Sequence, residues 1–204
     1  DVLSEKEVEK MIADFKEYLE KQFETANSFK PNKADWFEGR WQGFERADEG
    51  ARRGTTSVPL DELKAIGAKL TEVPESLNVH RTLQRVLKAK KKMIDTGENI
   101  DWATAEALAF GSLLKEKVPV RLSGQDSGRG TFSQRHSVIV DQVTEDRYVP
   151  LDNLGGEQAR FEVIDSLLSE AAVLGYEYGY TLAEPNALVL WEAQFGDFAN
   201  GAQV

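Results

Sequence analysis

An acidic residue at the start of a predicted helix is the first candidate for chemistry in this sequence. Glu170 follows an apolar run typical of a buried strand, and it stands directly after Ser169, a residue type that often caps helices. Ligands of open α/β sheets gather at the carboxyl ends of strands, so this carboxylate is expected where a ligand binds. The helix N-terminus favours the ionised form, whereas Leu167, Leu168 and Val173 favour the acid. The alternative is that Glu170 only complements the helix dipole.

One histidine, two phenylalanines and a glutamine are further candidates. His136 comes directly before the apolar run 137–143, and its imidazole can form hydrogen bonds or move a proton. Phe198, and in second place Phe195, offers a flat face on which a ring can stack, and Gln194 adds an amide. Each also has a structural alternative, because histidines and phenylalanines are often buried for packing alone.

Two other patterns have simple structural interpretations. Gly124, Gly128 and Gly130 do not have the GxGxxG spacing and no GKS or GKT follows, so we expect tight turns rather than a phosphate-binding loop. A lysine run over 88–92 is typical of a solvated helix face, with docking of a phosphate or a partner as the alternative.

Length and charge limit the classes of protein. With 204 residues the chain can bury a sizeable core in one or two domains. The formal net charge of −10 argues against a nucleic-acid partner, which requires a basic face. No apolar run approaches the roughly 20 residues that span a bilayer, so we expect no membrane segment. The lack of Cys excludes disulfides and thiolate metal sites and fits a reducing compartment.

The first hundred residues predict helices. Apolar residues at helical spacing predict three of them, over 4–26, 60–70 and 77–96. Gly97 is a natural stop for the third. Residues 27–54 form a loop too aromatic for a free linker, so we expect the loop to pack; its large rings are Trp36, Phe37, Trp41 and Phe44.

After residue 100 the pattern changes to alternating strands and helices. Asp101 caps a predicted helix over 102–116, and Ser169 caps another over 170–182. Extended segments are predicted at 118–122, 137–143, 147–151, 161–168 and 187–192. Such alternation predicts an α/β fold with a mostly parallel sheet and helices on its faces. The boundary between the helical and α/β regions is expected near 97–101.

Three sequence blocks identify a family resemblance. They are LSGQDSGRGTFSQRHSV (122–138), LLSEAAVLGYEYGY (167–180) and WEAQFGDFANGAQ (191–203). Together they resemble the thiamine-diphosphate-dependent first component of the 2-oxoglutarate dehydrogenase complex, at the part that holds the aminopyrimidine end of the cofactor. Weaker similarity over 30–44 and 51–75 extends this to most of the chain.

The resemblance implies a fold and a division into two parts. Residues 1–100 would be a helical linker region that joins an absent diphosphate-binding domain. Residues 101–204 would be the N-terminal part of a transketolase-like pyrimidine-binding domain. The start at Asp1 and a helix expected to begin at Phe198 suggest a fragment.

The resemblance also implies roles for residues. Glu170 would hydrogen-bond N1′ of the aminopyrimidine, Phe198 or Phe195 would stack on the ring, and Gln194 would contact it. His136 would act on the substrate side. The family binds Mg²⁺ through a Gly-Asp-Gly start and a paired Asn, and this chain lacks that motif. The metal ligands are therefore expected in the missing domain.

The implied function is that of a succinyl-transferring 2-oxoglutarate dehydrogenase. Such an enzyme decarboxylates 2-oxoglutarate and passes the succinyl group to a lipoyl-bearing succinyltransferase component. It acts as a homodimer, in the cytoplasm or in the mitochondrial matrix of a eukaryote. The alternative is a non-catalytic fragment that serves as a dimerisation or docking module.

Overall fold

The computed structural model describes residues 3–26, 28, 30, 39–45 and 54–203. Contacts divide the chain into two compact units, Asp1–Arg46 and Ala47–Val204. No helix within the described ranges is long and apolar enough to cross a membrane.

The first unit contains one long helix, α1 (Glu5–Ala26), and a short 3₁₀ turn at Gly39–Trp41. A capping box begins α1: the backbone N–H of Ser4 donates to the Glu7 carboxylate at 2.7 Å. The apolar side chains predicted to share one face are all exposed within the described residues, namely Val8, Met11, Ile12, Phe15, Leu19 and Phe23. In the aromatic loop Trp41 and Phe44 contact each other at 5.6 Å between ring centres, and Trp36 and Phe37 lie outside the described residues.

A three-stranded parallel sheet forms the centre of the second unit. Its strands are β1 (Val120–Gly124), β4 (Phe161–Asp165) and β5 (Leu188–Glu192), in the order β4-β1-β5. The predicted α/β fold with a parallel sheet is therefore confirmed. All of β1 is buried, as expected for the central strand between two parallel neighbours.

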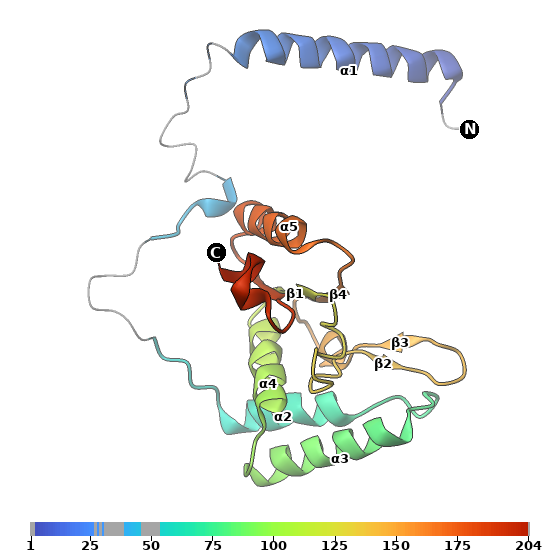
Figure 1. Ribbon diagram of the computed structural model, residues 1–204, viewed down its shortest axis with the longest axis vertical. Helices are drawn as coiled ribbons and strands as arrows, with labels where there is room; N and C mark the ends of the chain where they lie inside the picture. The colour runs from blue at the N-terminus through green and yellow to red at the C-terminus, as the bar shows by residue number, and fades with distance from the viewer. Residues whose placement is uncertain (1–2, 27, 29, 31–38, 46–53, 204) are drawn as a thin grey trace. The chain divides into compact units, whose positions relative to one another are not determined.

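Two helices lie on opposite sides of this sheet, α4 (Trp102–Lys115) on one side and α5 (Glu170–Ala183) on the other (Figure 1). Val120 and Leu122 of β1 pack in the main apolar cluster with residues of α4 such as Phe110 and Leu114. Arg121, between them in sequence, has its side chain toward α5, because successive side chains of a strand alternate in direction.

A buried ion cluster ties α5 to the sheet. The Arg121 guanidinium donates to both carboxylate oxygens of Glu177 on α5, at 2.7 and 2.9 Å, and to Glu162 on β4 at 2.7 Å. Its charged plane also lies 4.7 Å from the ring centre of Tyr180. The bonds to Glu177 raise the pKa of Arg121, so the cation persists despite burial.

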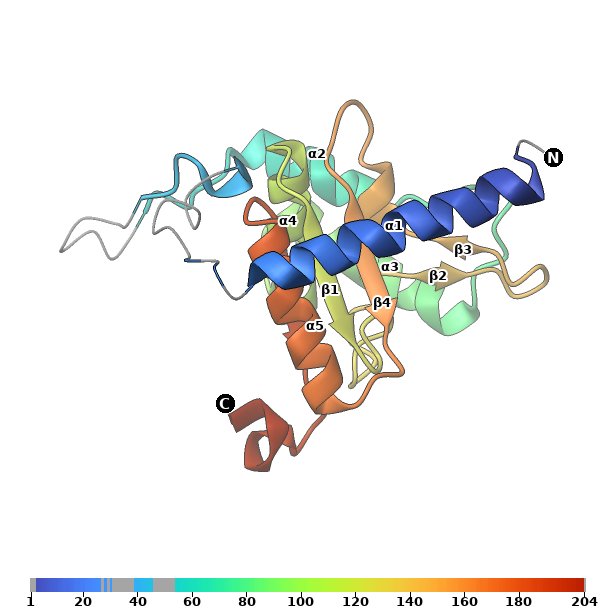
Figure 2. The same cartoon turned by 90° about the horizontal axis from the view of Figure 1, so that it is seen from above.

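Helices α2 (Leu60–Thr71) and α3 (Arg81–Thr96) complete this unit, beside α4 (Figure 2). Asp101 caps α4 as predicted, since its carboxylate accepts the Thr104 N–H at 2.7 Å. Because α2 packs against both α3 and α4, residues 54–96 belong to the same compact unit as the sheet. The division into 1–100 and 101–204 stays a prediction about domain roles.

Several predicted boundaries differ from the structure. The third helix begins at Arg81 rather than residue 77, and the first strand spans 120–124 rather than 118–122. The run 137–143 is not a strand of the main sheet: only β2 (Ile139–Val140) is extended, and it pairs antiparallel with β3 (Arg147–Tyr148). At the C-terminal end two 3₁₀ turns, Asp197–Ala199 and Gly201–Gln203, occupy the segment where an α-helix was expected to begin.

Candidate active site

The three parallel strands end level with one another. Gly124 at the end of β1 is paired with Asp165 of β4 and with Glu192 of β5. Loops leave the sheet at this edge, and α5 begins five residues after Asp165. A pocket opens here, and its lining residues are Gly124, Gln125, Ser166, Leu168, Glu170, Val173, Trp191, Glu192, Gln194 and Asp197. The carboxyl edge of the sheet is thus hollowed, as expected for a ligand site in this fold class.

Glu170 lies in this pocket, at the first residue of α5. Its carboxylate accepts hydrogen bonds from Asn200 Nδ2 at 3.3 Å and from the Gly201 backbone N–H at 3.1 Å. A side chain at residue 201 would contact the end of the Glu170 side chain and displace its carboxylate. The expected apolar surroundings are only partly present, because Leu167 and Leu168 are exposed and only Val173 is buried.

Gln194 lines the same pocket, whereas the two phenylalanines do not. The Gln194 amide donates to Asp126 at 3.1 Å, which joins the end of β5 to the loop after β1. Phe195 and Phe198 are 79% and 68% exposed. Their rings meet edge to face at 5.9 Å, and Phe195 makes a similar contact with Phe132 at 6.2 Å. These rings form an exposed aromatic surface, which disfavours a core-packing role for either phenylalanine.

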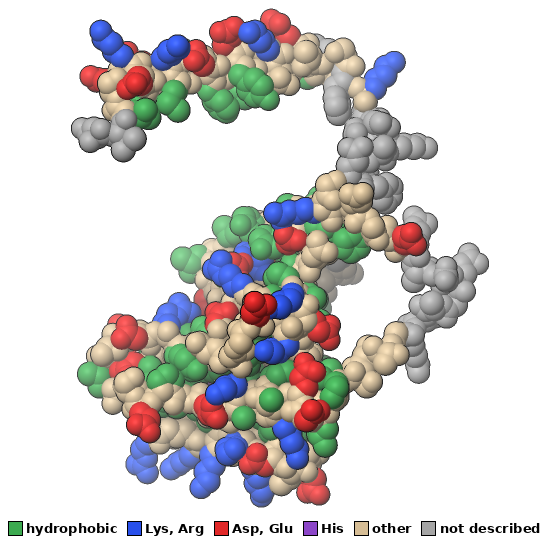
Figure 3. Space-filling view, turned by 180° about the vertical axis from the view of Figure 1, so that it is seen from behind, with side chains coloured by type: hydrophobic (Ala, Val, Ile, Leu, Met, Phe, Trp, Pro, Cys, Tyr) green, Lys and Arg blue, Asp and Glu red, His purple; other side chains and the backbone are tan. Residues whose placement is uncertain are grey.

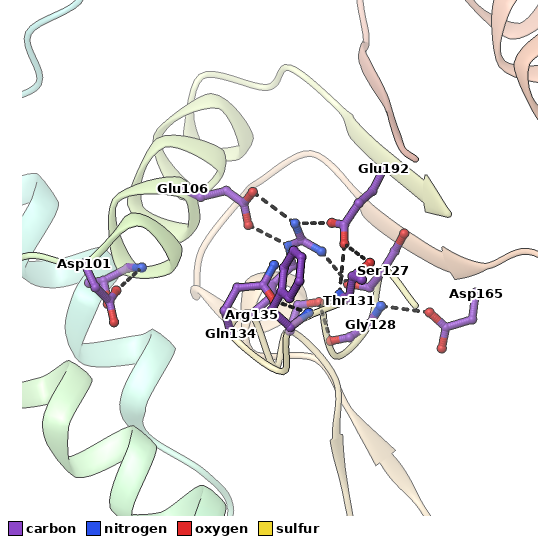
Figure 4. A network of polar contacts seen from close by, with 12 residues as sticks. Asp101, Glu106, Ser127, Gly128, Thr131, Gln134, Arg135, Asp165 and Glu192 are labelled. Carbon is purple, nitrogen blue, oxygen red and sulfur yellow. Dashed lines mark hydrogen bonds and ion pairs between the residues drawn. The ribbon is translucent and has the colours of Figure 1, made fainter. Parts of the chain in front are cut away.

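Arg135 organises the loop that follows β1 (Figure 4). It is buried and donates through two nitrogens to Glu106 of α4, at 2.6 and 3.2 Å, and to the Ser127 carbonyl at 3.0 Å. It also pairs with Glu192 at the end of β5. Burial alone would lower the pKa of Arg135, but the bonds to Glu106 and Glu192 outweigh burial and raise it.

This ion cluster was missed in the sequence interpretation. The other oxygen of Glu192 accepts from the backbone N–H and the hydroxyl of Thr131, both at 3.1 Å, and Asp165 accepts from the Gly128 N–H at 2.8 Å. Carboxylates therefore hold this loop; Gly128 and Gly130 lie in it, whereas Gly124 is the last residue of β1 and not part of a turn. An arginine and two glutamates far apart in sequence give no pattern from which such a cluster is predicted.

His136 lies in a different pocket from Glu170. It adopts a left-handed backbone conformation with φ of 47° and lines an apolar pocket with Lys90, Phe110 and Arg135. Burial lowers its pKa, as do the charges of Lys90 and Arg129, while a hydrogen bond involving the Ser133 backbone opposes the shift. The structure of this chain does not bring His136 and Glu170 together, so its role on the substrate side stays a prediction.

His80 is not inside a helix. It is the N-terminal cap of α3, and its Nδ1 accepts the Thr82 N–H at 3.3 Å. No group of three or more metal-binding side chains occurs among the residues that the structure describes.

Comparison with known proteins places residues 98–204 in a family of domains. They match the model described as transketolase, pyrimidine binding domain. The whole chain is 60% identical over 205 aligned residues to proteins named 2-oxoglutarate dehydrogenase E1 component from Brucella anthropi and Brucella melitensis biotype 2. A protein of the same name from Brucella canis is equally similar. The chain spans about one fifth of the length of these relatives.

Proposed function

We propose that this chain, which belongs to the transketolase pyrimidine-binding domain family, is the pyrimidine-binding part of a 2-oxoglutarate dehydrogenase E1 component. The observation behind this proposal is the position of Glu170, in a pocket at the carboxyl edge of a parallel sheet. Identity of 60% over the full chain supports the choice of enzyme within the family. The whole enzyme would decarboxylate 2-oxoglutarate and pass the succinyl group to a lipoyl-bearing succinyltransferase component.

The residues at this edge suit the aminopyrimidine ring of thiamine diphosphate. When protonated, the Glu170 carboxyl group can donate its O–H to a ring nitrogen, while its oxygens still accept from Asn200 and Gly201. The exposed rings of Phe198 and Phe195 offer faces on which a pyrimidine can stack, and Gln194 supplies an amide at the pocket wall. When bound, thiamine diphosphate supplies the electron sink that decarboxylation of a 2-oxo acid requires.

The same residues do not suit the diphosphate. Residues 161–204 contain no Lys or Arg but seven acidic side chains. A diphosphate with Mg²⁺ requires oxygen ligands and positive charge. We therefore assign the diphosphate and Mg²⁺ site to another domain of the longer enzyme, contributed by the second subunit of a homodimer. We expect that enzyme in the cytoplasm, or in the mitochondrial matrix of a eukaryote.

The test is Glu170→Gln in the longer enzyme. The amide keeps the shape of the side chain but cannot hold or return a proton in the same way, so decarboxylation should fall by roughly 10²–10⁴-fold. Circular dichroism should be unchanged, because the residue is only partly buried. Glu98→Gln, an exposed residue between α3 and α4, is the matched control. Near-normal turnover of Glu170→Gln would refute the assignment.

A further inference from the structure

Helix α3 bears a row of cations on a single face. Arg81, Arg85, Lys88 and Lys92 follow one another at spacings of four, three and four residues. With 3.6 residues per turn, these four positions fall within about 60° of arc and extend over about 16 Å. All four residues are exposed. They form what we call the basic row.

The basic row points directly away from the protein interior. The inward side of α3 consists of Leu87, Lys90 and Ile94, which are buried. On the same helical wheel these residues lie about 200° from the centre of the row. The cations therefore do not cover apolar neighbours with their aliphatic stems, a common role for surface lysines. In Figure 3 blue side chains gather along the lower edge of the molecule, where Figure 1 has α3.

Ion pairing does not account for the row. Within the described residues no side chain of the four forms an ion pair or a hydrogen bond; only the Lys92 carbonyl accepts, from Thr96. The one ion pair on α3 joins Lys91 to Asp95, outside the row. By contrast, every arginine and lysine from residue 115 onward except Arg147 is bonded to an acid or a carbonyl oxygen. Other described lysines, such as Lys6 and Lys64, also have no ion pair, so the distinguishing feature of the row is that its four cations share one face of one helix.

Helix stability does not account for the row either. Arg81 and Arg85 lie in the first turns of α3, where the positive end of the helix dipole disfavours cations. The last turn, where cations are favourable, has none. The first cations of the row are therefore unfavourable for the stability of α3. Residues that break such a local rule are often found at binding sites.

We propose that the basic row is a docking surface for an acidic segment of a partner protein. Three of the four cations, Arg85, Lys88 and Lys92, border a shallow open hollow on the surface of α3, together with Ala89, Lys91, Asp95 and Thr96, so an extended or helical segment can lie against them. Carboxylates repeated at the spacing of the row would meet all four cations at once. The partner is a protein and not a nucleic acid, because the net charge of −10 repels a long polyanion, whereas a short acidic segment feels mainly the local charge.

The experiment uses the full chain and two labelled helical peptides of identical composition. One peptide has Glu at i, i+4, i+7 and i+11, and in the other the same residues are shuffled. Fluorescence anisotropy at about 0.05 M salt should give at least about fivefold tighter binding of the spaced peptide, with the difference fading at about 1 M salt. Equal affinity for the two peptides, or no binding of either, would overturn the proposal.

Matched variants locate the binding. Arg85→Glu with Lys88→Glu should abolish the preference for the spaced peptide, and Arg85→Gln with Lys88→Gln should weaken it. Lys64→Glu with Arg147→Glu makes the same change of charge at two exposed residues outside α3 and should leave it intact. If this control pair loses affinity equally, the attraction is general and the row is not a site. A DNA duplex of the same charge that binds more tightly than the spaced peptide would also overturn the proposal.

Discussion

Asp141 shows how one buried carboxylate can fix a corner of the chain. It accepts backbone N–H groups from Asn78 at 2.6 Å, Val143 at 2.7 Å and Thr144 at 2.9 Å. These bonds, with the Asn78 N–H first among them, hold the pKa of Asp141 well below its usual range. They join the segment before α3 to the turn between β2 and β3. Asp141 lies within the apolar segment 137–143, which was predicted as a strand, but its role is to hold a turn in place.

The lowered pKa of Asp141 predicts a pH effect on stability. A group with a lower pKa in the folded state contributes stability that is present above its unfolded pKa of about 3.9 and is lost as pH falls further. Asp141→Asn should therefore reduce stability at pH 7 and flatten the fall of stability below about pH 4. Urea unfolding at pH 7 and pH 3 measures both effects. Asp95→Asn, at an exposed pair, is the control and should change little. An Asp141→Asn variant with an unaltered acid profile would contradict this explanation.

The second prediction at this scale concerns His136. In the longer enzyme His136→Ala should lower turnover of 2-oxoglutarate by roughly 10²-fold or more. Thiamine-diphosphate affinity should stay within about twofold, because His136 lines another pocket than Glu170 and makes no contact with it. Calorimetric titration of the cofactor and steady-state kinetics separate the two effects. His80→Ala, which removes only the exposed cap of α3, should leave both unchanged. Loss of cofactor affinity with normal turnover at saturating cofactor would refute the substrate-side role.

At the scale of the element, local rules predicted helices better than strands. The caps of α1 and α4 were predictable because they depend on residues three positions apart. The start of α3 was not predictable. Asp141, 63 residues later, binds the backbone N–H of Asn78, and the helix begins only after His80. The start of β1 at Val120 has a local cause instead, because Pro119 has no N–H to give to a sheet. A contact distant in sequence therefore sets only the start of α3.

In the candidate site, too, features set by neighbouring residues were predictable and features set by distant contacts were not. Glu170 at the start of a helix and Gln194 after a strand were both predictable, and both line the pocket. The cluster around Arg135 was not, because its acidic partners come from α4 and β5. The separation of His136 from Glu170 was not predictable either, since it depends on where the loop after β1 folds back.

Replacing glycine by alanine should change stability in opposite directions at two helical positions. A methyl group at Gly111 of α4 would overlap Ile66 of α2, so Gly111→Ala should destabilise the fold by about 1–3 kcal/mol. Gly175 of α5 has open space around it, so Gly175→Ala should stabilise by up to about 1 kcal/mol through helix propensity. Urea unfolding of both variants provides the comparison. Equal effects of the two changes would mean that α2 and α4 do not pack closely at this point.

At the scale of the whole molecule, the second unit exposes large apolar side chains at its candidate site. Phe132, Phe195 and Phe198 are each more than two thirds exposed, and Leu167 is fully exposed. Exposed aromatic residues of this number, beside a pocket, are typical of a binding surface. This surface fits the proposal that a second domain encloses the cofactor against it.

The last prediction is that the chain by itself does not bind thiamine diphosphate tightly. One aromatic stack and one charge-assisted hydrogen bond contribute about 2–4 kcal/mol. Association costs about 4–15 kcal/mol in lost freedom of motion. The diphosphate and its metal must supply the difference, and the C-terminal residues 161–204 offer them acids and no cation. Calorimetric titration of the chain with thiamine diphosphate and Mg²⁺ should therefore give no binding in the micromolar range.

The same titration of the longer enzyme shows whether the diphosphate site lies outside this chain. The longer enzyme should bind the cofactor in a metal-dependent way, and Glu170→Gln in that enzyme should weaken the binding only modestly, because most of the affinity comes from the diphosphate. Micromolar, metal-dependent binding to the chain alone would mean that the diphosphate site lies within these 204 residues. Within the described residues α3 presents several cations beside an open hollow, so the variants of the basic row would show whether those cations hold phosphate instead of an acidic partner.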